Sequence, residues 1–334
     1  MGTLPRILPR RGTLVLAALA ALLAPSALSP ARAQGNWPNR PIRVIVPQPP
    51  GGNLDIIVRS LSEGLQAELG QPVVVENRPG GNSVIGLEAC AVAAADGYTF
   101  CGVSVEVMST YPYVEPQLFA RYASLRPVTQ IVSSPGVLLA SAEVPARTLP
   151  EFVAWARGKR DLNYSSSGNG SSQNLLWEWI KARDHLEMQH VPYRGVSEAI
   201  NELAAGRVQA SYVALGLALP QIQAGRIKPL AVLGASRIPQ LPDTPSMHEI
   251  GYDFPYTGAW WGLATAANTP PAIVERVARA VHAVVHSAGY RERIIAPGGY
   301  VPSGSTPAEF TALIEEERAK GAEIVRLAGV RPGN

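Results

Sequence analysis

The chain has 334 residues, of which 46% are hydrophobic and 16% charged, and its formal net charge is +3. This composition excludes a disordered chain, and the 31 glycines and 30 prolines follow no period, which excludes a collagen-like chain. The length is typical of two folded domains with room for a large core. A basic chain suits a nucleic-acid or membrane partner only if the positive charges lie in its folded part.

Residues 1–33 predict a signal peptide. Arginines precede a small, apolar run at residues 14–23, which is shorter than the roughly 20 residues that span a bilayer, so an uncleaved anchor helix is the less favoured alternative. Ala31-Arg32-Ala33 has the small-x-small form of a cleavage site. We therefore expect cleavage after Ala33 and export out of the cytoplasm, with the general and the twin-arginine routes both open.

This segment also carries the excess positive charge. It contains four arginines and no acidic residue, so the remaining 301 residues have a formal charge of −1. Global charge then gives no support to nucleic-acid binding, and we expect no nucleic-acid partner.

The pattern from residue 42 to residue 103 alternates short apolar runs with longer amphipathic segments. It predicts strands at 42–46, 73–76 and 98–103 and helices at 54–69 and 86–95. A β-α-β-α-β order with helical crossovers predicts a parallel sheet in an α/β domain.

A second series of units predicts another α/β domain, so that a groove separates the two. Its helices are expected at 149–157, 175–182, 197–205 and 219–224, and its strands at 162–165, 189–192, 209–214 and 229–233. A further strand is expected at 260–264, followed by helices at 271–287 and 307–327.

The two cysteines, Cys90 and Cys101, both lie in the exported part of the chain, where a disulfide is permitted. Cys90 falls in a predicted helix and Cys101 in the next strand, so a bond forms only if Cys90 faces the sheet. Two buried free thiols are the alternative, and the sequence leaves the choice open.

Two loops carry the residues best suited to bind an anion. Residues 47–55, Pro-Gln-Pro-Pro-Gly-Gly-Asn-Leu-Asp, lie between a strand and a helix, where glycines allow close approach and the helix start offers free N–H groups. A tight turn capped by Asn53 or Asp55 is the alternative. The loop is neither a G-x-G-x-x-G motif nor a P-loop, which disfavours nucleotide binding.

The second loop, residues 164–174, places hydroxyls and small residues before a helix of the second unit, so the two loops face one another across the groove. A flexible polar loop is the alternative. A serine nucleophile needs G-x-S-x-G and a partnered base, and neither is evident, since the nearest histidines stand isolated: His185, His190 and His248.

A histidine pair and a tryptophan pair are two further candidates for a function. His282 and His286 lie four apart on a predicted helix, but no third ligand accompanies them, so we expect structural histidines, no metal site and no cofactor. Trp260-Trp261 suits the wall of an apolar pocket or an anchor in the core equally well.

A set of short motifs follows in order along nearly all of the chain after residue 33. The first ones are Pro38-Asn39-Arg40-Pro41-Ile42-Arg43, the Pro-Pro-Gly-Gly loop with Asp55, the segment 69–80 and Asp96-Gly97-Tyr98-Thr99. The later ones are Gly168-Asn169-Gly170, the segments 190–195, 224–226 and 241–245, and Trp260-Trp261-Gly262-Leu263. Together they resemble the Bug proteins, the periplasmic solute receptors of tripartite tricarboxylate transporters.

The resemblance implies an α/β, two-domain periplasmic binding protein fold of a type II-like kind. Each domain would be a mixed, mostly parallel sheet flanked by helices. By analogy, residues 34–132 and 234–334 form domain 1, residues 133–233 form domain 2, and a ligand cleft lies between them.

The resemblance also implies that the two loops grip a carboxylate through backbone N–H groups, hydroxyls and bound water. The candidates on one side are Gln48, Gly51, Gly52, Asn53 and Asp55. Those on the other side are Ser167, Asn169, Gly170, Ser171 and Ser172, with Ser104 and Tyr193 nearby.

Three positions depart from the family pattern. Gln48 stands where Phe is common, Asn174 where many members have His, and Val213 where many carry Asp. A carboxylate at position 213 would partner a ligand amine, so its loss favours a ligand without a basic amine, such as a dicarboxylate or an aromatic acid.

The resemblance therefore implies a monomeric receptor, without enzymatic activity, that captures a small carboxylate by domain closure and delivers it to integral membrane transporter subunits. The alternatives are a ligand-sensing receptor for a sensor kinase, a periplasmic serine hydrolase that uses Ser171, and a structural or adhesive module.

Overall fold

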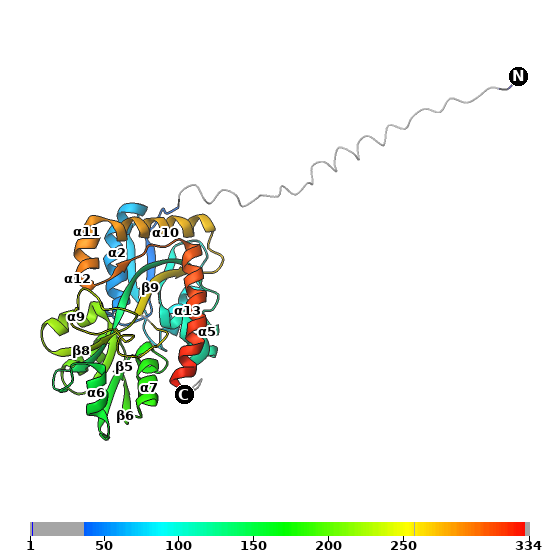
Figure 1. Cartoon of the computed structure of the whole chain (residues 1–334). Helices are drawn as coiled ribbons and strands as arrows, with labels where there is room; N and C mark the ends of the chain where they lie inside the picture. The colour runs from blue at the N-terminus through cyan, green and yellow to red at the C-terminus, as the bar shows by residue number, and fades with distance from the viewer. Residues whose placement is uncertain (1, 3–36, 257, 331–334) are drawn as a thin grey trace. The chain divides into compact units, whose positions relative to one another are not determined.

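The computed structural model describes Gly2, residues 37–256 and residues 258–330. The expected signal peptide, apart from Gly2, lies outside these residues. From Pro38 onward the chain forms one compact unit (Figure 1). Within the described ranges, no helix combines the length and the apolar character that a membrane crossing requires.

Three parallel strands and two connecting helices form the first part of the sheet. Strand β1 (Ile42–Val46) lies between β2 (Val73–Asn77) and β3 (Thr99–Ser104) and is parallel to both. The predicted β-α-β-α-β order is confirmed, with α2 (Asn53–Leu69) and α3 (Val84–Ala91) as the crossovers. Helix α2 buries the apolar face that its spacing predicted: Leu54, Ile57, Val58, Leu61 and Leu65.

Antiparallel strands extend this part. Strand β9 (Gly258–Thr265) pairs with β3 and with the long strand β4 (Arg126–Ser141), and β10 (Val301–Pro302) pairs with β4. The sequence did not predict β4, because two serines, Pro135 and Gly136 interrupt its apolar run in the middle.

The second part of the sheet grows from the far end of β4. Strands β7 (Ala210–Ala214) and β8 (Ile227–Val232) run antiparallel to β4, and β5 (Leu162–Ser166) lies parallel to β7 and β6 (Met188–Pro192). The flanking helices are α6 (Leu149–Ala156), α7 (Ser172–Asp184), α8 (Val196–Ala204) and α9 (Leu215–Gln223). Helices α7 and α9 begin earlier than predicted.

Strand β4 joins the two parts at Pro135 and Gly136. Up to Pro135 it pairs with β9, and from Gly136 onward it pairs with β7 and β8. A Cβ atom at Gly136 would lie 2.3 Å from the ring of Tyr212, so only glycine fits at this crossing. The chain returns to the first part between β8 and β9.

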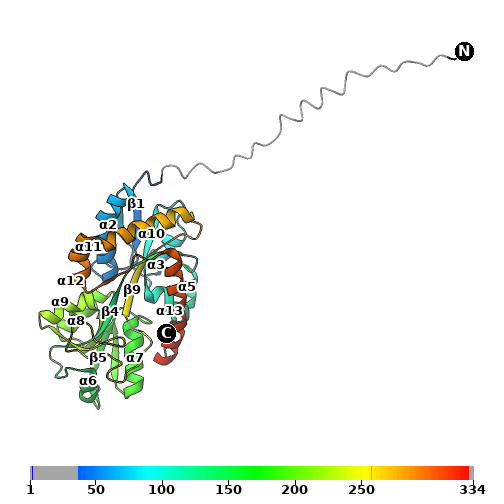
Figure 2. The ribbon, with the colours of Figure 1, turned by 45° about the horizontal axis from the view of Figure 1, so that its top comes forward.

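The C-terminal segment covers the sheet with helices α10 (Pro271–His286), α11 (Ala288–Tyr290), η3 (Arg291–Ile295), α12 (Ala296–Gly298) and α13 (Pro307–Ala328). A capping box between Thr306 and Glu309 starts α13. Figures 1 and 2 show α13 running beside β9 toward α7. It packs against β4, α7 and the segment η2 (Glu106–Thr110), which α4 (Tyr111–Val114) and α5 (Pro116–Ala120) follow.

A disulfide joins Cys90 and Cys101, whose Cα atoms lie 6.0 Å apart. It ties α3 to β3, and both sulfur atoms are buried near the carbonyl oxygen of Ala264 on β9. Cys90 therefore faces the sheet, and of the two alternatives that the sequence left open the structure has the disulfide and not two free thiols.

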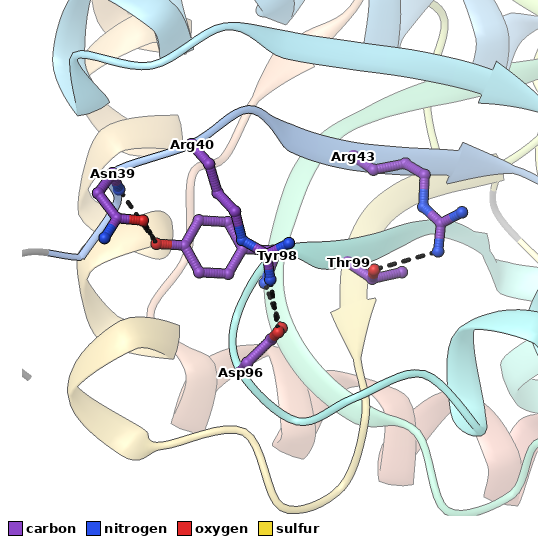
Figure 3. A network of polar contacts seen from close by, with 6 residues as sticks. All are labelled: Asn39, Arg40, Arg43, Asp96, Tyr98 and Thr99. Atoms are coloured by element: carbon purple, nitrogen blue, oxygen red, sulfur yellow. Dashed lines mark hydrogen bonds and ion pairs between the residues drawn. The ribbon is translucent and has the colours of Figure 1, made fainter. Parts of the chain in front are cut away.

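Two of the quoted motifs contact each other where β1 and β3 begin (Figure 3). The guanidinium of Arg40 lies 4.0 Å from the centre of the Tyr98 ring and 2.7 Å from a carboxylate oxygen of Asp96. The Tyr98 hydroxyl donates to Asn39 Oδ1 at 2.9 Å. Since the candidate loop 47–55 follows the opposite, carboxyl end of β1, this cluster holds the strands and not a ligand.

The histidine pair on α10 also has a structural role. The imidazole nitrogens His282 Nδ1 and His286 Nε2 contact the carbonyl oxygens of Gly304 and Ser303 at 2.9 and 3.0 Å. These contacts fix the segment before α13. Among the described residues, no group of three or more potential protein ligands surrounds a metal position.

Candidate ligand-binding cleft

A cleft of about 1330 Å³ lies where the two parts of the sheet meet. Its walls come from loops that follow β1, β2 and β3 in the first part and β5 and β6 in the second, and from residues within β7 and β9. Loops at the carboxyl ends of parallel strands are the usual position of a ligand site in α/β proteins. The volume is large enough for a small organic molecule.

Three helices begin at this cleft: α2 after Gly52, α7 after Ser171 and α8 after Gly195. Ser171 caps α7 by accepting the N–H of Asn174 at 3.3 Å. Gly52 and Gly195 offer no side-chain cap, so the first N–H groups of α2 and α8 lack this acceptor. The positive ends of three helix dipoles thus meet at one cavity, an arrangement that favours an anion.

Nine of the twelve residues that the sequence singled out line the cleft, and they come from both parts of the sheet. They are Gln48, Gly52, Asn53, Ser104, Ser167, Asn169, Ser171, Ser172 and Tyr193. The other three are not part of the lining: Asp55 and Gly170 are buried, and Gly51 is exposed.

Asp55 is buried and holds the loop before α2. Its carboxylate accepts the N–H of Gly51 at 3.0 Å and the side-chain amide of Asn77 at 2.8 Å, and it pairs with Arg59 at 2.9 Å. Burial alone would raise the pKa of Asp55, but the bonds from Arg59, Gly51 and Asn77 together hold it below its ordinary value. An ionised Asp55 therefore orders the loop and is not offered to a ligand.

Gly170 and Asn174 shape the second loop. Gly170 has φ +72°, and a Cβ atom there would lie 2.6 Å from Val114. Its N–H donates to Asn174 Oδ1 at 3.0 Å, and the amide of Asn174 donates to the Tyr164 hydroxyl at 2.8 Å. Asn174, one of the three departures from the family pattern, thus braces the loop.

The hydroxyls of this loop each have a protein partner. Ser167 donates to Gln173 Oε1 at 3.1 Å, Ser171 to the Gly168 carbonyl at 2.7 Å, and Ser172 to Glu106 Oε1 at 2.7 Å. The last bond joins α7 to η2 across the cleft. A second bond across the cleft runs from the Ser197 hydroxyl on α8 to the Gly51 carbonyl, at 2.8 Å.

The expectation of isolated histidines is wrong for two of them. His248 pairs with Asp253 at 2.8 Å, and His190 Nε2 contacts the hydroxyl of Ser166. Burial lowers the pKa of His190. Ser166 is fully buried, and neither Ser166 nor His190 lines the cleft. A molecule bound in the cleft therefore does not contact this pair.

The prediction that Val213 removes a partner for a ligand amine is also wrong. Val213 packs into the core with Ile200 and Leu203, whereas its neighbours Tyr212 and Ala214 line the cleft. Side chains alternate along a strand, so position 213 of β7 faces away from the ligand. Its apolar side chain thus carries no information about a ligand amine.

Sequence reasoning missed several cleft residues, among them Asn82, Ser83, Glu106, Tyr111, Ser197 and Tyr212. A signal existed for Glu106, because it comes three residues after the carboxyl end of the predicted strand at 98–103. Asn82 and Ser83 have φ +50° and +77°, in the left-handed region that Asn tolerates and Ser rarely adopts. Of the tryptophan pair, Trp261 lines the cleft, and Trp260 packs edge-on against Phe310.

The charged side chains of the lining are mostly acidic. They are Glu106, Glu115, Glu198 and Glu202, against Arg194. Attraction for an anion in this cleft therefore comes from helix ends and backbone N–H groups more than from side-chain charge.

Comparison with known proteins places this geometry among solute receptors. The family model for the tripartite tricarboxylate transporter family receptor matches residues 57–330. Protein BugT of Bordetella pertussis is 30% identical over 328 residues, which cover 96% of this chain and 98% of BugT.

Two solved structures are similar over the same range. Periplasmic binding protein BugD has a TM-score of 0.82 at 27% identity, over 89% of this chain and 100% of BugD. R. palustris Rpa4515 with adipate has a TM-score of 0.83 at 30% identity, over 89% of this chain and 100% of Rpa4515.

Proposed function

Because the chain belongs to the tripartite tricarboxylate transporter receptor family and has the fold of a periplasmic binding protein, we propose that it binds a small carboxylate in the cleft. It releases this solute to the membrane subunits of a transporter. The adipate bound to Rpa4515 supports the ligand class, and the family description supports the partner.

The observation that carries the proposal is the convergence of three helix N-termini, two of them without a side-chain cap. A carboxylate placed between α2 and α8 accepts the first N–H groups of both helices, which no side chain caps among the described residues, and it meets the positive ends of the dipoles. The predicted residues Gly52, Asn53 and Ser171 sit at these helix starts, so we propose backbone recognition there.

Binding is coupled to closure of two lobes. We assign residues 34–132 and 234–334 to one lobe and 133–233 to the other, with the boundary inside β4 close to Gly136. The bonds from Ser197 to Gly51 and from Ser172 to Glu106 each join the two lobes. A ligand that contacts both lobes only in the closed form shifts the population toward that form.

A thermal-shift panel tests carboxylate binding. Dicarboxylates of increasing length and aromatic acids are compared with their neutral amides, which have the same shape but no charge. At 100 times its dissociation constant a ligand stabilises the folded protein by about 2.7 kcal/mol, so a true ligand raises the melting temperature by a few degrees. Equal shifts with acids and amides, or no shift with any acid, would contradict the proposal.

Mass spectrometry addresses the ligand and the processed chain together. Under native conditions, gently purified protein is expected to retain a bound acid, whose mass identifies it. Under denaturing conditions, the proposed cleavage after Ala33 gives a mature chain that begins at Gln34. A chain that starts elsewhere would refute the cleavage site but not the binding function.

A further inference from the structure

Glu106 begins η2 at the side of the cleft nearest to α7. Its Oε1 accepts the Ser172 hydroxyl at 2.7 Å, and in the described part of the chain no hydrogen bond reaches its other oxygen, Oε2. The side chain is half-buried and belongs to the cleft lining. One carboxylate oxygen is therefore available to a hydrogen-bond donor on a bound molecule.

Three tyrosines in this part of the molecule are buried: Tyr111, Tyr212 and Tyr256. Burial raises the pKa values of Tyr111, Tyr212 and Tyr256, and the charge of Glu106 raises each of them further. The charge of Glu106 thus acts in the same direction as burial on the pKa of each phenol and favours its protonated form. Tyr111 and Tyr212 line the cleft.

The Tyr212 hydroxyl is a second unsatisfied group at this place. Its ring packs edge-on against Tyr256 at 6.0 Å between centres. Although the two hydroxyls are neighbours, neither makes a hydrogen bond of good geometry within the described residues. A buried hydroxyl left in this way costs free energy, which a ligand group can recover.

We propose that Glu106 and Tyr212 bind a hydroxyl or ammonium group of the ligand, so that the preferred ligand is a substituted acid. This inference rests on the proposed function, in which the helix starts hold the ligand carboxylate. A donor on the ligand meets Glu106 Oε2 and pairs with the Tyr212 hydroxyl. A second carboxylate at the same place would be repelled by Glu106.

The inference reverses the expectation drawn from position 213. Val213 lies in the core and says nothing about the ligand, and the carboxylate that a donor needs comes from the segment after β3 instead. The ligand class therefore narrows from any small carboxylate to an acid with a donor group.

The test is calorimetry with two matched sets of acids: succinate, malate and aspartate, and adipate, 2-hydroxyadipate and 2-aminoadipate. A hydrogen bond to a charged group corresponds to about ten- to a hundredfold in affinity. We expect the wild type to bind a hydroxy or amino acid of one set that much more tightly than the unsubstituted diacid. Glu106→Gln should remove this preference and tighten binding of the unsubstituted diacid, because repulsion is lost.

Two further variants control the result. Glu115→Gln removes a charge from another part of the same lining, between α4 and α5, so this variant should keep the wild-type preference. Tyr212→Phe keeps the ring and removes the hydroxyl, so it should reduce the preference even if Glu106→Gln folds poorly. Circular dichroism and melting curves check the fold of each variant.

The outcomes separate this inference from the function on which it rests. If no acid of either set binds but another acid of the thermal-shift panel does, this inference fails and the proposed function stands; if no acid of the panel binds, both fail. If the acids bind without preference for a donor, or if Glu106→Gln weakens all of them equally, only this inference fails. A preference that Glu115→Gln abolishes as completely as Glu106→Gln also refutes it, because general cleft charge would then be the cause.

Discussion

Replacing Gly52 by aspartate is expected to stabilise the free protein and to weaken carboxylate binding. Both effects arise because the new side chain and the ligand compete for the same N–H groups at the start of α2. Gly52 has φ −78° and ψ 164°, the extended conformation of an N-cap residue. A Cβ atom there would lie 3.8 Å from Gln48 Oε1 and 3.9 Å from the Pro49 carbonyl, so a side chain fits without a clash.

The gain in stability of the free protein is smaller than the loss of ligand-binding free energy. An aspartate cap improves on glycine by a few tenths of a kcal/mol, and its charge at the helix start adds about 0.3–1 kcal/mol, so we expect a gain of about 0.5–1 kcal/mol. Each N–H bond that a ligand carboxylate loses costs about 1.5–3 kcal/mol, which is at least a tenfold rise in the dissociation constant. A variant that melts higher and binds more weakly is the expected result.

The assay combines thermal unfolding without ligand and calorimetry with the acid that gives the largest thermal shift. Gly52→Ala is the matched control, because it adds a Cβ atom but no acceptor, and it should keep most of the binding. If Gly52→Asp binds as tightly as the wild type, the N–H groups of α2 are not the anion site. If Gly52→Ala weakens binding equally, the effect is steric and the argument fails.

Three other predictions concern the hydrogen bond of Ser197, the disulfide and the carboxylate of Asp55. Ser197→Ala loses the bond to Gly51 and should raise the dissociation constant of the ligand about two- to tenfold, because a neutral hydrogen bond contributes about 0.5–1.5 kcal/mol to closure. Ser197→Thr keeps the hydroxyl and is the control. Equal affinities of Ser197→Ala and the wild type by calorimetry would contradict the prediction. Replacing Cys90 and Cys101 together by alanine opens a loop with a sequence separation of 11 residues and should lower the free energy of unfolding, measured in urea, by about 3 kcal/mol. An unchanged urea midpoint would contradict this. The pKa of Asp55 is lowered in the folded state, so its contribution to stability is present above the ordinary pKa of 3.8 and is lost as the pH falls through the lowered pKa. Between pH 7 and pH 3, the free energy of unfolding in urea should therefore fall more steeply for the wild type than for Asp55→Asn. Parallel curves would refute this.

Local signals in the sequence were enough to predict most of the elements. The spacing of Leu54, Ile57 and Leu61 predicts the buried face of α2 because a helix repeats every 3.6 residues whatever lies around it. Glycines and small polar residues between a strand and a helix predict the two cleft loops, because a helix start always leaves N–H groups free. The arginines before residue 33 likewise account for the net positive charge of the chain.

Tertiary structure decided everything that depends on pairing between distant segments. Strand β4 exists because β9, β7 and β8 supply its partners, although its own sequence is interrupted at Pro135 and Gly136. The register of β7 turns Val213 into the core and Tyr212 into the cleft, and a shift of one residue would exchange them. The meeting of Glu106 with α7, 66 positions away in the chain, has no local signature. Residue types and helical periods are local properties, whereas the side of a strand that faces a ligand is set only when the sheet is assembled.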